Sequence, residues 1–125
     1  MYVKTTGGNY FEVVNTDGYG SMVVWKIKSA ICDGSLFYYD FILGTVRVYD
    51  IEYEMSEEEY VNELAKWLLR NAESVEAKEQ FLKWGKDHGW MFEIYDDGFI
   101  CGTNGKKMTM VSGGSNGICD VSYKR

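Results

Sequence analysis

The chain has 125 residues and is 46% hydrophobic and 16% aromatic, a composition that excludes intrinsic disorder and allows one domain with a substantial core. Its 19 acidic and 13 basic residues give a formal net charge of −6. An acidic balance argues against nucleic acid or an anionic membrane as a direct partner, because both bind basic surfaces.

Four strands are predicted in the first half of the chain, over residues 9–15, 21–32, 35–43 and 45–54. Residues 22–28 alternate between apolar and mixed positions, which indicates a strand with one side buried. Residues 36–43 are almost continuously aromatic or aliphatic. We therefore expect that strand in the middle of a sheet, with both of its faces covered.

The strand predicted over 45–54 changes its buried side along its length. Val46 and Val48 share one side with the acids that follow, whereas Tyr49 and Tyr53 lie on the other side. The inward side therefore changes near Val48–Tyr49, and the two tyrosines point inward beyond it. We expect a β-bulge or a sharp bend at this point.

Two helices follow, over residues 56–72 and 74–88. Ser56 and Glu59 have the S-x-x-E spacing of a capping box, which marks the beginning of the first helix. The second helix is expected to end near His88, where Gly89 follows. The apolar residues of the first helix recur at helical spacing: Val61, Leu64, Ala65, Leu68 and Ala72.

Four more strands are predicted over residues 90–96, 98–102, 106–111 and 118–123. The chain contains no proline, so we expect its tight turns at Asp-Gly and Asn-Gly pairs, which tolerate positive φ. These pairs are Asp17-Gly18, Asp33-Gly34, Asp97-Gly98, Asn104-Gly105 and Asn116-Gly117.

Strand blocks on either side of a helix pair predict an α+β fold. Strands occupy residues 9–54 and 90–123, and the helices lie between them. We expect an antiparallel sheet of meander hairpins with the inserted two-helix unit packed on one face, in a single domain over residues 1–125.

The net charge of the chain is concentrated between Tyr49 and Ala65, where seven acids occur without a base. The helix explains part of this run, because carboxylates in the first turn interact favourably with the helix dipole and Glu59 closes the capping box. Glu63 can also pair with Lys66. The helical acids therefore need little functional explanation.

The acids before the helix have no such explanation. Asp50, Glu52 and Glu54 occupy alternate positions, so in a strand all three would point the same way, roughly 6.6 Å apart. This spacing is close to that of successive phosphates on a nucleic-acid strand. The other interpretation is an edge strand protected by charge against aggregation.

We therefore predict a cytoplasmic, non-enzymatic protein that covers a basic surface of a partner protein, such as a nuclease or another nucleic-acid-binding protein. Phage-encoded inhibitors, anti-CRISPR proteins among them, and toxin-immunity proteins are also small and acidic, a likeness of charge and size alone. The predicted contact residues are Asp50, Glu52, Glu54, Glu57 and Glu58.

Two alternative functions remain open. Aromatic strands could enclose a small-ligand pocket lined by Trp25, Tyr38 and Tyr39. A cysteine-dependent enzyme could use Cys101 or Cys119 with His88. No cofactor or metal is expected, because the acids near loops lack the spacing of a calcium loop and the three cysteines lack zinc-site spacing.

Overall fold

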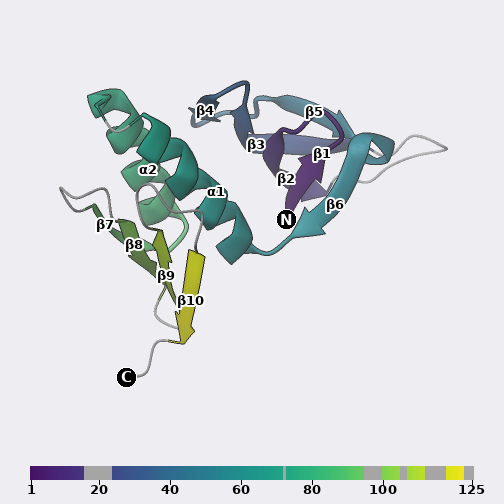
Figure 1. The fold of residues 1–125 in the computed structure, drawn as a ribbon. Coiled ribbons are helices and arrows are strands. Elements are labelled where there is room, and N and C mark those ends of the chain that lie inside the picture. Colours follow the sequence, from purple (N-terminus) through teal and green to yellow (C-terminus); the bar gives the residue numbers. More distant parts are fainter. Residues whose placement is uncertain (16–23, 72, 95–99, 105–106, 112–117, 123–125) are drawn as a thin grey trace. The chain divides into compact units, whose positions relative to one another are not determined.

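A computed structural model describes residues 1–15, 24–71, 73–94, 100–104, 107–111 and 118–122 (Figure 1). The chain divides into two compact units, Met1–Tyr60 and Val61–Arg125. Antiparallel strands occur in both units and two helices lie between the strand blocks, so the predicted α+β class is confirmed. The expectation of a single domain stays a prediction.

Unit 1 contains a six-stranded antiparallel sheet. The strand order is β4-β3-β2-β1-β6, and β5 pairs with β3 beside β4 (Figure 1). The strand β1 was not predicted, because its four residues carry no long alternating pattern and its last residue, Thr5, begins a Thr-Thr-Gly-Gly stretch. The bounds are β1 Tyr2–Thr5, β2 Tyr10–Asn15, β3 Val24–Cys32, β4 Ser35–Tyr38, β5 Gly44–Arg47 and β6 Ile51–Met55.

A short 3-10 helix, η1 (Val48–Asp50), joins β5 to β6 and forces the sheet to coil. Because β5 pairs with β3 and β6 with β1, a flat sheet would hold them about 19 Å apart, four strand spacings. Three residues of 3-10 helix rise only about 2 Å each, which is far too short. The bend predicted near Val48–Tyr49 is therefore confirmed.

The core of unit 1 lies on the inner face of this coiled sheet. Val3, Val13, Ile27, Ala30 and Val46 are buried there, and partly buried apolar side chains pack around them. These residues come from β1, β2, β3 and β5, so burial of apolar surface holds the coil together.

The segment predicted as a central strand over 35–43 is different in the structure. Only Ser35–Tyr38 form a strand, at the edge of the sheet, and residues 39–43 leave it. The reason is that β4 pairs with Ser29–Cys32 of β3, while β5 takes the place beside Val24–Ile27. The turn before β4 is as predicted, with positive φ at Asp33 and Gly34.

Unit 2 contains most of the first helix, the second helix and a four-stranded antiparallel sheet in the order β10-β9-β8-β7. Both helices begin and end within about two residues of their predicted bounds. The bounds are α1 Glu57–Arg70, α2 Val75–Asp87, β7 Met91–Ile94, β8 Ile100–Thr103, β9 Lys107–Val111 and β10 Ile118–Ser122. The Asp17-Gly18, Asp97-Gly98 and Asn116-Gly117 turns, and Gly105, lie outside the described residues.

The ring of Phe92 on β7 joins α2 to this sheet. It stacks on Phe81 of α2 with ring centroids 4.2 Å apart. A Cβ on Gly85 of α2 or on Gly102 of β8 would come within 2.4 Å or 2.6 Å of ring atoms of Phe92. Both glycines are therefore required by close packing, and the ring lies between helix and sheet.

Candidate functional site

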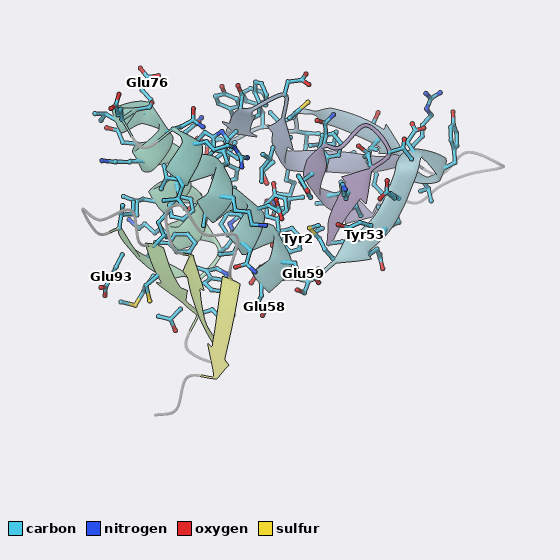
Figure 2. All side chains as sticks on the ribbon, viewed as in Figure 1. Tyr2, Tyr53, Glu58, Glu59, Glu76 and Glu93 are labelled. Carbon is cyan, nitrogen blue, oxygen red and sulfur yellow. The ribbon has the colours of Figure 1, made fainter. Side chains whose placement is uncertain are left out.

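The five acids predicted as contact residues lie in three consecutive elements of unit 1. Asp50 ends η1, two acids lie in β6 and two in the first turn of α1. Figure 2 shows Tyr53 on β6 and Glu58 at the beginning of α1. We call these five residues the acidic edge: Asp50, Glu52, Glu54, Glu57 and Glu58.

The prediction that Asp50, Glu52 and Glu54 alternate along one strand is wrong for Asp50. This residue belongs to η1, because the bend that coils the sheet ends there and strand β6 begins only at Ile51. Glu52 and Glu54 occupy alternate positions of β6. The pairing of β6 with β1 shifts at Thr5, so that Glu52 has no direct partner on β1.

Strand β6 lies at the end of the sheet order and pairs with β1 alone among the described strands. Its three central residues, Glu52, Tyr53 and Glu54, are all exposed. A strand in this position presents both its side chains and an unpaired backbone edge to a partner. The fold therefore leaves the centre of the acidic edge open to contact.

Two cations accompany these acids. Lys4 lies 3.9 Å from a carboxylate oxygen of Glu52, and Arg47 lies 3.3 Å from Asp50. All four side chains are partly exposed, and ion pairs of this kind contribute at most about 1 kcal/mol. Five carboxylates and two cations leave an acidic surface, so these pairs reduce its charge without cancelling it.

Two tyrosines on this surface are exposed, although their alternation predicted that they point inward. Tyr49 is 68% exposed and Tyr53 is 43% exposed. The same two cations lie over their rings, with Arg47 at 4.9 Å from the centroid of Tyr49 and Lys4 at 5.8 Å from that of Tyr53. Exposed tyrosine is enriched where proteins contact one another, so both rings extend the candidate site.

The helical part of the acidic edge is more constrained. Glu57 is half-buried and accepts a hydrogen bond of 2.6 Å from the hydroxyl of Tyr2. Glu58 is also half-buried. Glu59 exchanges hydrogen bonds with Ser56 as the predicted capping box requires. The most accessible acids are therefore those of β6.

A buried polar network anchors the first turn of α1 in unit 1, and the sequence did not reveal it. Ser29 donates a 2.7 Å hydrogen bond to Glu12, and its oxygen lies 2.8 Å from the hydroxyl of Tyr60. Because Ser29 gives its only proton to Glu12, Tyr60 is the donor in the second bond. Burial, reinforced by the negative charge of Glu12, raises the pKa of Tyr60 well above its ordinary value.

The residues of the predicted ligand pocket separate in the structure. Tyr38 and Tyr39 line a cavity of about 320 Å³, together with Lys28, Asp40, Phe41 and Ile42. Trp25 instead packs against the core of unit 1. The small-ligand function stays a prediction.

The described residues of the predicted cysteine-dependent site include no activated thiol. Burial raises the pKa of Cys101, and the charge of Glu93 adds to the effect, so the thiol is protonated at neutral pH. Nδ1 of His88 lies 2.7 Å from the carbonyl oxygen of Trp84, and the ring stacks on that tryptophan. The side chain of Cys119 lies outside the described residues.

The described residues hold no cluster of three His, Cys, Asp or Glu side chains placed to bind a metal ion. No helix in the described ranges has the length and apolar character needed to cross a bilayer. Comparison with protein families, with curated proteins and with solved structures finds no match to this chain.

Proposed function

We propose that this protein is a non-enzymatic binding protein that acts in the cytosol and covers a basic surface of a partner protein through the acidic edge. The observation that carries the proposal is the exposure of Glu52, Tyr53 and Glu54 on a strand that ends the sheet. An edge strand with charged side chains is protected from aggregation, and the same charges attract a partner of opposite sign.

The partner surface is expected to be rich in arginine or lysine. Arginine binds carboxylates through two parallel hydrogen bonds, and its planar group also stacks on tyrosine. Tyr49 and Tyr53 already hold cations over their rings within the chain. Alternate positions of a regular strand lie about 6.6 Å apart, which is close to the spacing of successive phosphates on a nucleic-acid strand, so a nuclease or another nucleic-acid-binding protein is the preferred partner class.

The proposal can be tested with an arginine-rich peptide as the basic probe. The double variant Glu52→Gln and Glu54→Gln keeps the size of both side chains and removes two charges. We expect its affinity to fall about tenfold, with a weaker dependence on salt, because opposite charges on exposed surfaces steer association. Binding is measured by NMR titration of the labelled protein from about 20 to about 300 mM salt.

The matched control is Glu76→Gln with Glu79→Gln, which removes two exposed charges from α2 in unit 2 (Glu76 is labelled in Figure 2). This variant should bind as the wild type does. In the wild type, the perturbed amides should cluster in η1 and β6. Equal losses in both double variants would mean that only net charge matters, and the proposed site would be rejected.

A further inference from the structure

The hydrogen bonds of β1 show which of its residues face β6. The amide of Thr5 donates to the carbonyl oxygen of Asn9 at 2.9 Å, on the side of β2. The amide of Thr6 donates to the carbonyl oxygen of Asp50 at 3.0 Å, on the side of β6. Successive residues of an antiparallel strand turn their N–H and C=O groups to opposite sides. The odd-numbered residues of β1 therefore face β2, and the even-numbered residues face β6.

The register between β1 and β6 then fixes the direction of the β6 backbone. Lys4 lies opposite Tyr53 and has its backbone towards β6, so these two residues form a hydrogen-bonded pair. Glu54 lies opposite Val3, whose backbone faces β2 instead. The N–H and C=O groups of Glu54 therefore point away from β1, towards the open edge where the described sheet ends (Figure 1).

The carboxylate of Glu54 is available at the same edge. The side chain is exposed, and within the described part of the chain no ion pair or hydrogen bond involves it, whereas Glu52 lies beside Lys4. A residue added directly opposite Glu54 would have its Cβ about 5 Å from that of Glu54, within reach of a lysine or arginine. Glu54 thus offers a donor, an acceptor and a negative charge to a neighbouring strand.

We propose that the basic partner binds as an extended segment that adds a strand to the open edge of β6, pairs with the backbone of Glu54 and places an arginine or lysine beside its carboxylate. Main-chain hydrogen bonds give such a contact affinity, and side chains give it specificity. Charge selects the occupant, because β6 of a second copy would bring acids together, which destabilises a sheet. Strand addition rests on the proposed function, since the same acids attract the same basic partner.

Peptides that differ only in the position of backbone methyl groups test this contact. The parent is a short peptide with blocked ends in which arginine and threonine alternate in equal number. One derivative is N-methylated at every arginine and the other at every threonine, so charge and composition are matched. An arginine opposite Glu54 turns its own N–H towards β6, so arginine methylation should weaken binding at least about tenfold. Threonine methylation should change affinity by less than about threefold, because those N–H groups face away.

Hydrogen exchange of the wild-type protein provides a second measurement. With saturating parent peptide, exchange of the Glu54 amide should slow at least about tenfold, whereas the Tyr53 amide, which already faces β1, should change less. Equal affinities of the two methylated peptides, or an unprotected Glu54 amide, overturn strand addition.

The Glu52→Gln and Glu54→Gln double variant distinguishes that failure from failure of the proposed function. If this variant binds the parent peptide more weakly than the α2 control variant does, while the two methylated peptides bind the wild type equally, the acidic edge attracts basic partners without strand pairing. If the two double variants bind the parent peptide equally, the proposed function is rejected, and strand addition is rejected with it.

Discussion

At the scale of single residues, the least expected feature is a carboxylate buried in the sheet of unit 1. Glu12 is only 6% exposed, and it is satisfied by Ser29 from the neighbouring strand, which also contacts Tyr60 of α1. A buried charge is tolerated only when hydrogen bonds compensate for its lost hydration. The sequence could not predict this network, because its members are 17 and 31 residues apart and none has a local signature.

Ser29 is the centre of this network and provides a test of its energetic importance. Ser29→Ala removes the donor to Glu12 and the acceptor for Tyr60, so we expect the free energy of unfolding to fall by about 2 kcal/mol. Urea unfolding followed by tryptophan fluorescence measures the change. Ser35→Ala, at an exposed position of β4, should alter stability by less than about 0.5 kcal/mol. Equal effects of the two substitutions would show that the network adds nothing.

At the scale of elements, the helices were predicted well because their signals are local. The capping box and the apolar spacing of α1 lie within a few turns, and Ser74 caps α2 through its own side chain. The strand after Leu36 was predicted incorrectly, because an apolar run does not reveal which neighbour a strand pairs with. Competition between β4 and β5 for β3 decides that outcome, and Tyr39, Phe41 and Ile42 are left exposed outside the strand.

The packing of α2 on the sheet of unit 2 predicts an unusual response to alanine. Alanine normally favours a helix over glycine by about 1 kcal/mol, but at Gly85 its methyl group would meet the ring of Phe92. Gly102→Ala meets the same ring from β8. We expect each substitution to reduce stability by about 1–3 kcal/mol.

Thermal unfolding followed by circular dichroism measures both glycine variants. Gly44→Ala is the control, because a Cβ there contacts nothing within 4 Å, and its melting temperature should stay close to that of the wild type. A stabilised Gly85→Ala variant would contradict the close approach of Phe92 to α2.

At the scale of the whole molecule, the buried tyrosines predict how stability depends on pH. Burial is the main cause that raises the pKa of Tyr2 and Tyr60, and a hydrogen bond to Glu57 adds to the effect at Tyr2. Above about pH 10 the unfolded chain loses tyrosine protons that the folded chain keeps. Stability is therefore unaffected by these groups below about pH 10 and falls as the pH rises further.

Tyr60→Phe removes one of these groups, so the stability of this variant should fall less steeply above pH 10 than that of the wild type. The two slopes should differ by up to about 1.4 kcal/mol per pH unit. Urea unfolding at several pH values between 8 and about 11.5 gives the slope. The slope is compared rather than the absolute stability, because phenylalanine also removes a hydrogen bond at every pH. A Tyr60→Phe slope equal to that of the wild type would reject the explanation.

The candidate site was only partly predictable from the sequence. Clustering of charge located the segment around Glu52 and Glu54, because acids without bases are visible in the chain itself. The position of Lys4 beside it was not visible, since the pairing of β1 with β6 brings Lys4 there from the other end of unit 1. The exposure of Tyr49 also depended on η1, whose geometry no alternating pattern specifies.

The pairing of β1 with β6 also sets an order of assembly. These strands come from opposite ends of unit 1, so bringing them together costs more chain entropy than closing any of the intervening hairpins. We therefore expect strand β6 to join the sheet after the hairpins between have formed, and to open before them. The acidic edge therefore exists only in the finished fold, and a partner that recognises it distinguishes complete molecules from partly folded ones.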